Sequence, residues 1–297
     1  MTLPLEGVFI ALASPFSGDS VSPEKMEENV GKYNRTDLAG YLVLGSTGES
    51  VLLSDEESER LVEAVVRAAA PGRRVLVGTA RESTRATIAF TKRVARKGVA
   101  AALVRPPSYY RSRMTREALK SHFLAVAEAS PVPLMIYNIP QNTGLNLEPQ
   151  LVVDLAPHPN IVGLKESSGS LAYLAEVVRD VPPDFRYFLG SGHVLLPGLE
   201  MGASGAILAV ANAAPETCAE VFRLFKAGQR NEARKLQLDL IPLNRAVTET
   251  YGVAGLKHAQ DLRGLYGGPA RLPLLPLDEK GRREVEAGLR KLDLPRL

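Results

Sequence analysis

A lysine that follows a short apolar run is the residue of this sequence best suited to covalent chemistry. Lys165 comes directly after Ile161-Val162-Gly163-Leu164 and before a small polar turn that ends at Gly169. Such a run is typical of a buried strand, although a run this short also fits a buried segment of helix. A lysine at the end of a buried strand loses hydration, which favours the free amine, and a free amine forms Schiff bases with ketones. The alternative is a surface lysine that only marks the end of a strand.

Eight short apolar runs alternate with helical patterns over about the first 225 residues. The runs are expected to be strands at 8–13, 41–44, 75–77, 101–104, 133–137, 161–165, 187–189 and 206–209. Helix start signals lie between them, such as Ser22-Pro23-Glu24 and the capping box Ser54-Asp55-Glu56-Glu57. This alternation predicts a parallel sheet wrapped by helices, and eight strands favour a closed (β/α)8 TIM barrel over a doubly wound sheet. No Gly-x-Gly-x-x-Gly follows the first strand, as a dinucleotide site would require.

The pattern changes near Pro215, because helical patterns then follow one another with no apolar strand between them. We therefore expect a barrel over residues 1–225 and a helical extension over residues 226–297. The extension is expected to pack on the barrel or on a neighbouring subunit.

Composition limits the classes of function. The 297 residues include 45% hydrophobic and 23% charged residues, and the net charge of +3 is small and dispersed, which argues against nucleic acid or an anionic membrane as partner. The segment Met1-Thr2-Leu3-Pro4-Leu5-Glu6 lacks the features of a signal peptide, and no run approaches the roughly 20 apolar residues of a membrane span. The single cysteine, Cys218, excludes an intramolecular disulfide and fits a reducing compartment. A soluble, cytoplasmic protein is expected.

Hydroxyl-bearing residues follow several of the expected strands, and the loops after the strands of a barrel converge on one mouth. Ser46 and Thr47 follow the second strand, Tyr109 and Tyr110 follow the fourth, and Tyr137 ends the fifth. Phenol and alcohol groups can move the protons that a Schiff base needs as its carbinolamine loses water. The Gly45-Ser46-Thr47-Gly48 turn can offer N–H and O–H donors to a substrate carboxylate.

Each of these residues also has a purely structural interpretation. The turn at 45–48 equally fits a tight turn before a helix, and Tyr137 equally fits a core ring with its hydroxyl at the rim. Tyr109 and Tyr110 equally fit an exposed pair that packs against another subunit. Cys218 lies in a helical pattern without a histidine partner and is expected in the core. The histidines show no metal-ligand spacing, so structural roles and no metal site are expected for His122, His158, His193 and His258.

Four short motifs together resemble the dihydrodipicolinate synthase / N-acetylneuraminate lyase family of pyruvate-type class I aldolases. They are Gly45-x-Thr47-Gly48-Glu49, Tyr109-Tyr110, Tyr137-x-x-Pro140 and Gly163-x-Lys165-Glu166. The resemblance covers essentially the whole chain. It implies a (β/α)8 barrel with a C-terminal helical extension, usually a homotetramer, with pyruvate or another 2-oxo acid as substrate and no metal or organic cofactor.

The same resemblance implies roles for individual residues. Lys165 forms the Schiff base, and Tyr137 shuttles protons with Thr47 and with Tyr110, which is lent across a dimer interface. Ser46 and Thr47 hold the carboxylate. The further pocket contacts that the resemblance implies are Ser167, Gly190 and Ile207.

The segment after Tyr137 bears on which member of the family this chain is similar to. Dihydrodipicolinate synthases usually carry an arginine just after this turn, where it grips the carboxylate of the second substrate, and Asn142 stands at that place. A neutral amide lacks the charge and the fork of an arginine. We therefore expect Arg111 or Arg113 to bind a distal carboxylate instead.

Several other segments look like the 4-hydroxy-2-oxoglutarate aldolase branch. They are Glu82-Ser83-Thr84-x-Ala86-Thr87, Tyr109-Tyr110-Arg111-x-Arg113-Met114, Asn142-Thr143-Gly144-Leu145, His158-Pro159-Asn160-Ile161-Val162-Gly163, Tyr251-Gly252-x-x-Gly255-Leu256-Lys257 and Tyr266-Gly267-Gly268-Pro269. Thr47 departs from that branch, whose animal enzymes carry Asn there.

The first expectation is therefore a Schiff-base lyase that reversibly cleaves 4-hydroxy-2-oxoglutarate, or a related 4-hydroxy-2-oxo acid, to pyruvate and an aldehyde. The alternatives within the enzyme class are 4-hydroxy-tetrahydrodipicolinate synthase, which condenses pyruvate with aspartate semialdehyde, and a lyase or dehydratase of sugar acids such as N-acetylneuraminate lyase or 2-keto-3-deoxygluconate aldolase. From a different class, a non-catalytic barrel that senses 2-oxo acids is disfavoured, because binding alone needs neither Lys165 nor Tyr137.

Overall fold

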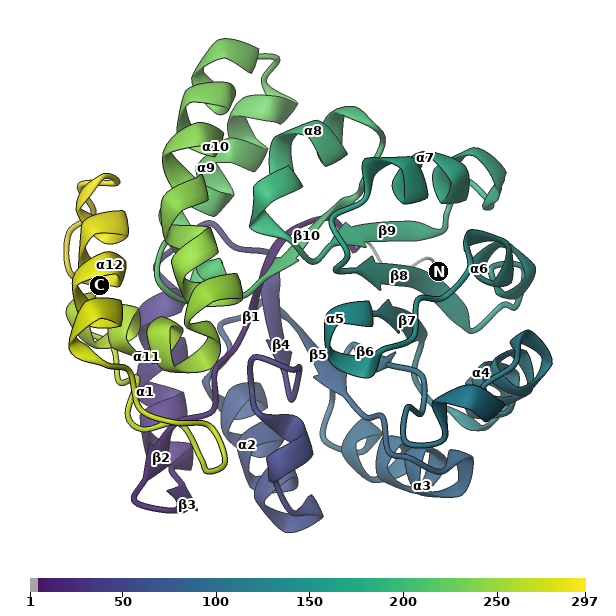
Figure 1. The fold of residues 1–297 in the computed structure, drawn as a ribbon. Helices are drawn as coiled ribbons and strands as arrows, with labels where there is room; N and C mark the ends of the chain where they lie inside the picture. The colour runs from purple at the N-terminus through teal and green to yellow at the C-terminus, as the bar shows by residue number, and fades with distance from the viewer. Residues whose placement is uncertain (1–4) are drawn as a thin grey trace.

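A closed barrel of eight parallel strands forms the centre of the protein in a computed structural model that describes residues 5–297 (Figure 1). Residues 1–4, part of the segment from which no signal peptide is expected, lie outside the described residues. The strands are β1 Gly7–Ala11, β4 Gly40–Val43, β5 Arg74–Gly78, β6 Ala101–Val104, β7 Leu134–Asn138, β8 Ile161–Glu166, β9 Arg186–Leu189 and β10 Gly205–Leu208. Sequential neighbours pair from β4 to β10, and β1 closes the ring by pairing with both β4 and β10. The predicted (β/α)8 barrel is confirmed.

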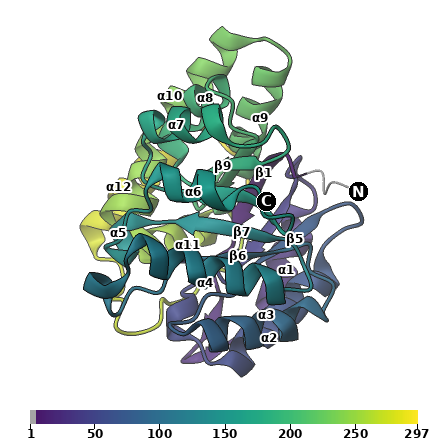
Figure 2. The same cartoon turned by 90° about the vertical axis from the view of Figure 1, so that its right-hand side faces the viewer.

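Helices surround the barrel, and Figure 2 shows them from the side. They are α1 Pro23–Tyr33, α2 Asp55–Ala68, α3 Thr84–Ala95, α4 Arg116–Ala129, α5 Pro140–Thr143, α6 Pro149–Leu155, α7 Leu171–Asp180, α8 Leu195–Glu200 and α9 Pro215–Lys226. The predicted start signals are real caps. Ser22 Oγ accepts the N–H of Lys25, and Ser54 and Glu57 form the reciprocal capping box.

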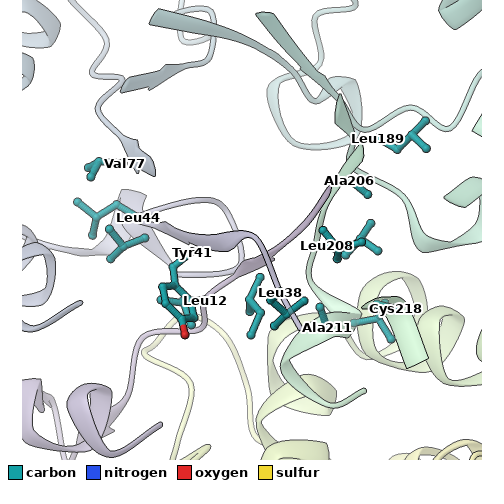
Figure 3. Close-up of a cluster of buried hydrophobic side chains, with 14 of the residues drawn as sticks. Leu12, Leu38, Tyr41, Leu44, Val77, Leu189, Ala206, Leu208, Ala211 and Cys218 are labelled. Atoms are coloured by element: carbon teal, nitrogen blue, oxygen red, sulfur yellow. The ribbon is translucent and has the colours of Figure 1, made fainter. Parts of the chain in front are cut away.

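The barrel strands are buried on both faces, which explains why they are continuous apolar runs rather than alternating ones. Side chains such as Phe9, Leu42 and Phe188 fill the barrel interior, with the Phe9 and Phe188 rings 5.5 Å apart edge to face. A larger cluster lies on the outer face, beneath the helices (Figure 3). Cys218 on α9 is part of this outer cluster and is fully buried, so its expected core position is confirmed.

A small antiparallel hairpin follows β1 and was not expected from the sequence. It pairs β2 Phe16–Ser17 with β3 Ser20–Val21 across a turn in which Gly18 has φ 60°. Two-residue strands are too short to carry an alternating pattern, so only tertiary contacts identify them. One such contact is the Tyr266 hydroxyl, which donates to the carbonyl of Phe16.

The chain after α9 contains only helical elements. They are α10 Arg230–Arg245, the π-helical turn η5 Ala246–Thr250, α11 Gly252–Leu262 and α12 Glu279–Arg290. They lie together on one side of the barrel, where α10 packs on α9 and α12 packs on α11 (Figure 1). The predicted division at residues 225 and 226 falls at the end of α9. It stays a prediction, because α9 packs on both β1 and α10.

Candidate active site

Lys165 and Tyr137 lie side by side at the carboxyl ends of two neighbouring strands. Lys165 on β8 is the register partner of Tyr137 on β7, so both side chains point to the same face of the barrel wall. The Nζ atom of Lys165 lies 4.4 Å from the centre of the Tyr137 ring, and the two residues are 4% and 5% exposed. Because β8 ends at Glu166, one residue after the lysine, the predicted position of Lys165 at the strand end is confirmed.

Lys165 is free of acidic partners in the part of the chain that the structure describes. Among residues 5–297 no carboxylate oxygen lies within 4.0 Å of its Nζ atom. No carboxylate therefore competes with a substrate carbonyl for the amine. The hydroxyls of Tyr137 and Thr47 make no hydrogen bond to one another, so the proton relay between them stays a prediction.

A polar network that the sequence analysis missed holds the ends of β7 and β8 together. The Glu166 carboxylate is buried and accepts hydrogen bonds from the Ser168 N–H at 2.6 Å and from the Asn138 side chain at 3.2 Å. Asn138 also donates to Asn146 at 2.8 Å. Since side chains alternate along a strand, Glu166 points away from the face that carries Lys165. The network thus fixes the strand ends that directly follow Lys165 and Tyr137.

The turn that carries Ser46 and Thr47 is held in an unusual backbone conformation. Leu44 and Glu49, at its two ends, have φ values of 61° and 54°, in the left-handed region that residues other than glycine rarely adopt. Within the turn the Gly48 N–H donates to the Gly45 carbonyl at 3.1 Å. The N–H groups of Ser46 and Thr47 donate no hydrogen bond within the described residues, so they are available to an anion.

Lys165, Tyr137, Ser46 and Thr47 line one cavity of about 500 Å³. Its inner part is polar and includes Ser167, Gly190 and Gln141, whose side-chain amide donates to the Ser167 carbonyl at 3.0 Å. Its outer part is mostly apolar, and much of it comes from the extension: Val247, Tyr251, Val253, Ala254, Leu256, Pro273, Leu274 and Leu275. Sequence reasoning missed these residues, because no local signal relates them to strands more than 80 residues earlier.

Gly190 and Ser167 meet at the strand ends in a contact that only glycine allows. The Gly190 N–H donates to the Glu166 carbonyl at 2.6 Å. A Cβ atom at position 190 would overlap the Ser167 Oγ atom. Both residues line the Lys165 cavity, and their contact with substrate, which the resemblance implies, stays a prediction.

Two of the expected site residues lie elsewhere in the single chain. Ile207 is fully buried in the barrel interior beside Phe9 and is not among the lining residues of the cavity, whereas Ala209 is. Tyr110 is 70% exposed, packs edge to face on Tyr109 at 5.1 Å, and does not line the cavity either. A role for Tyr110 therefore requires a second subunit, and this stays a prediction.

The two arginines considered as carboxylate ligands occupy different positions. Arg111 lies against Gly144, at the end of the turn that contains Asn142, and lines a second cavity that shares Ser46 and Asn142 with the first. Arg113 lines neither cavity. The geometry favours Arg111 over Arg113 as the nearer cation. Within the Lys165 cavity itself, Lys165 is the only cationic residue among the described lining residues.

Three further observations on residues 5–297 concern metal ligands, the buried histidine His122 and membrane-spanning helices. No three histidine, cysteine, aspartate or glutamate side chains in this range are grouped to hold a metal ion. His122 is buried, accepts or donates a 2.9 Å hydrogen bond with Thr84, and has its pKa lowered to about 4 by burial. None of the helices in this range is both long and apolar enough to span a membrane.

Comparison with known proteins decides the family. The model of the dihydrodipicolinate synthetase family matches residues 4–292. The chain belongs to this family. It is 36% identical over 277 residues to a 4-hydroxy-tetrahydrodipicolinate synthase of Methanosphaerula palustris, a match that covers 92% of this chain and 94% of the relative.

Two solved structures of the dihydrodipicolinate synthase family share the fold closely. One is the dihydrodipicolinate synthase of Cyanidioschyzon merolae with lysine bound, at a TM-score of 0.93 and 30% identity, covering 98% of this chain and 99% of that one. The other is a prophage protein of the dihydrodipicolinic acid synthase family from E. coli K12 in complex with pyruvate. Its TM-score is 0.92 at 26% identity, covering 97% and 99% of the two chains. The predicted resemblance is confirmed, and the chain is an enzyme of the class I aldolase type, whose covalent lysine replaces a metal or organic cofactor.

Proposed function

We propose that Lys165 forms a Schiff base with the 2-oxo group of pyruvate and that the enzyme makes or breaks a carbon–carbon bond between pyruvate and an aldehyde. The observation that carries this proposal is the position of the Lys165 amine in the cavity, 4.4 Å from the Tyr137 ring and with no acidic partner among residues 5–297. The pyruvate complex of the E. coli relative supports pyruvate as the donor.

In the proposed reaction Lys165 forms the covalent bond, and the other site residues move protons or bind the carboxylate. The amine attacks C2 of pyruvate, and loss of water from the carbinolamine gives an iminium. Loss of a C3 proton gives an enamine, whose C3 attacks the aldehyde carbon, and the aldehyde oxygen takes up a proton. Hydrolysis by one water then frees Lys165. Tyr137 moves these protons, with Thr47 and a Tyr110 from another subunit, while Ser46 and Thr47 donate hydrogen bonds to the carboxylate.

Aspartate semialdehyde is the better supported acceptor. The relatives that share 32–36% identity with this chain are named 4-hydroxy-tetrahydrodipicolinate synthase, so they favour condensation over our first expectation, the cleavage of 4-hydroxy-2-oxoglutarate. The cleavage reaction remains a second candidate because of one observation. Asn142 lines the cavity where an arginine would hold the semialdehyde carboxylate, and Lys165 is the only cation among the described lining residues.

Two measurements on one purified sample test these proposals. Borohydride reduction in the presence of pyruvate should attach one pyruvate unit to Lys165, located by peptide mass spectrometry, while the other buried lysine, Lys257, stays unmodified. Absence of the adduct would refute the Schiff base. Pyruvate consumption with aspartate semialdehyde is then compared with pyruvate release from 4-hydroxy-2-oxoglutarate. Consumption alone identifies the synthase, release alone identifies the aldolase, and an adduct with neither reaction points to sugar acids.

A further inference from the structure

A buried ion pair joins the C-terminal extension to the turn that carries Ser46 and Thr47. Glu49, which ends this turn, has its Oε1 atom 2.6 Å from Nζ of Lys257 on α11, and the two side chains are 0% and 1% exposed. Neither residue has a part in the proposed proton transfers. A buried pair of this kind costs desolvation energy and is often no more stabilising than apolar residues of the same volume, so its presence invites a functional explanation.

Two separate parts of the extension hold the Glu49 carboxylate. Lys257 approaches Oε1, and the backbone N–H of Arg271 donates to Oε2 at 2.8 Å. Lys257 is itself fixed, because its Nζ atom donates to the Pro269 carbonyl at 2.7 Å and lies 4.4 Å from the centre of the Phe16 ring. Burial lowers the pKa of Lys257, and the charge of Glu49 opposes this shift.

The turn needs such an anchor. Glu49 adopts a left-handed backbone with φ 54°, which is unfavourable for a side chain with a Cβ atom and persists only where the surroundings hold it. From the barrel side, Ser14 Oγ donates to the Gly48 carbonyl at 2.6 Å. From the extension side, the anchors are Lys257 and Arg271. Ser46 and Thr47, which line the Lys165 cavity, directly precede the anchored residues Gly48 and Glu49.

We propose that Glu49 and Lys257 are positioning residues that hold the 45–48 turn in the shape that binds the carboxylate of the 2-oxo acid. The ion pair also neutralises Glu49, whose negative charge would otherwise lie directly behind the turn and repel that carboxylate. The inference rests on the proposed function, because it assumes that the turn binds the substrate carboxylate.

Substitution of Glu49 and substitution of Lys257 should raise the KM for pyruvate by different amounts. Glu49→Gln loosens the turn but removes the negative charge, whereas Lys257→Met loosens the turn and leaves that charge unpaired. Both variants should therefore raise the KM for pyruvate, Lys257→Met more than Glu49→Gln. The turn also carries Thr47 of the proposed proton relay, so kcat at saturating pyruvate should fall as well, but by less than the rise in KM, because Lys165 and Tyr137 are untouched. We expect an increase in KM of about tenfold or more and a change in kcat of less than about threefold.

A second ion pair between the extension and the barrel provides the matched control. Arg263, whose side chain is 1% exposed, lies 2.6 Å from Glu216 on α9 and does not touch the turn. Arg263→Met and Lys257→Met should both lower Tm, but only Lys257→Met should raise the KM for pyruvate. Equal effects of Arg263→Met and Lys257→Met on KM would show a general loss of packing and overturn the proposal, as would an unchanged KM in Lys257→Met.

A double variant and a second readout keep the test decisive if a single variant does not fold. Glu49→Gln/Lys257→Met leaves no unpaired buried charge, so it should fold and still show the raised KM. Hydrogen exchange of the peptide that contains residues 44–50 should be faster in this variant than in Arg263→Met. If the unmodified protein forms no pyruvate adduct, the proposed function fails but the exchange measurement still decides whether the ion pair holds the turn. Unchanged exchange would refute the anchor.

Discussion

The Nζ atom of Lys165 lies 4.4 Å from the centre of the Tyr137 ring because the two residues are register partners on adjacent parallel strands. In a parallel pair, register partners point to the same face, so the barrel wall itself brings the nucleophile and the phenol together. The Glu166–Asn138 hydrogen bond on the other face of the same two strands keeps this register. The relationship therefore depends on strand pairing rather than on a flexible loop.

Substitution of Lys165 should prevent the covalent adduct, whereas substitution of Tyr137 should slow turnover and still allow the adduct to form. Lys165→Met should abolish the borohydride adduct and all turnover, because no other described residue of the cavity carries an amine. Tyr137→Phe keeps the ring beside the lysine but removes the proton carrier, so kcat should fall by roughly 10²–10⁴-fold while the adduct still forms slowly. Steady-state kinetics and adduct mass measure both effects. Full activity of Tyr137→Phe would exclude Tyr137 as the proton shuttle.

Gly190→Ala should block the inner part of the cavity. The added methyl group would overlap Ser167 Oγ and crowd the Glu166 carbonyl, which must move the strand end that carries Lys165. We expect the KM for pyruvate to rise at least about tenfold, with a fall in Tm from the overpacking. Gly31→Ala on α1, where nothing lies within 4 Å of an added Cβ atom, is the matched control: it should leave KM unchanged and should not lower Tm, because alanine is favoured over glycine inside a helix.

Asn142→Arg should shift the choice of acceptor. It places a cation in a cavity whose only described cationic lining residue is Lys165, so condensation of pyruvate with aspartate semialdehyde should improve, by about tenfold in kcat/KM. Arg111→Ala is the companion variant, because Arg111 lies against the turn that contains Asn142 and lines the second cavity that Asn142 shares. If Arg111→Ala leaves the KM for the carboxylate-bearing acceptor unchanged, Arg111 does not hold that carboxylate.

A mixing experiment tests whether Tyr110 acts in a neighbouring subunit. Tyr110→Ala and Lys165→Met should each be nearly inactive alone. If Tyr110 is lent across an interface, subunit exchange between equal amounts of the two variants turns half of the pairs into mixed pairs with one complete site of two, so activity returns to about a quarter of the unmodified level. No recovery after exchange, verified by native mass spectrometry, would place Tyr110 outside the relay. The expected homotetramer is measured in the same spectra.

Acid should destabilise the protein partly through His122. Burial lowers the pKa of this imidazole from 6.5 to about 4, so between these values the unfolded chain binds a proton that the folded chain does not. The stability that His122 provides is therefore present above pH 6.5 and lost as the pH falls toward 4, by roughly 3 kcal/mol at most. His122→Gln should flatten the fall of Tm between pH 6.5 and 4. An equally steep fall in the variant would show that other groups cause it.

Local patterns were enough to predict the strands, the helix caps and the position of Lys165. Apolar runs and capping residues act over a few neighbouring residues, so the Ser54 capping box and the end of β8 at Glu166 could be predicted from sequence alone. The barrel followed from counting strands, since eight parallel strands with helical connections have few other ways to bury their apolar faces.

Only the tertiary structure placed residues that are distant in the chain. Glu49 and Lys257 both lie in motifs visible in the sequence, yet their ion pair joins positions near the two ends of the chain and leaves no local signal. The apolar outer wall from η5 and the segment at 273–275 arises in the same way. The resemblance placed Ile207 at the pocket. In the closed barrel its position along β10 buries it in the interior, away from the residues that line the cavity. The sequence thus determined which residues can do chemistry, and the packing of the extension on the barrel decided which of them share a site.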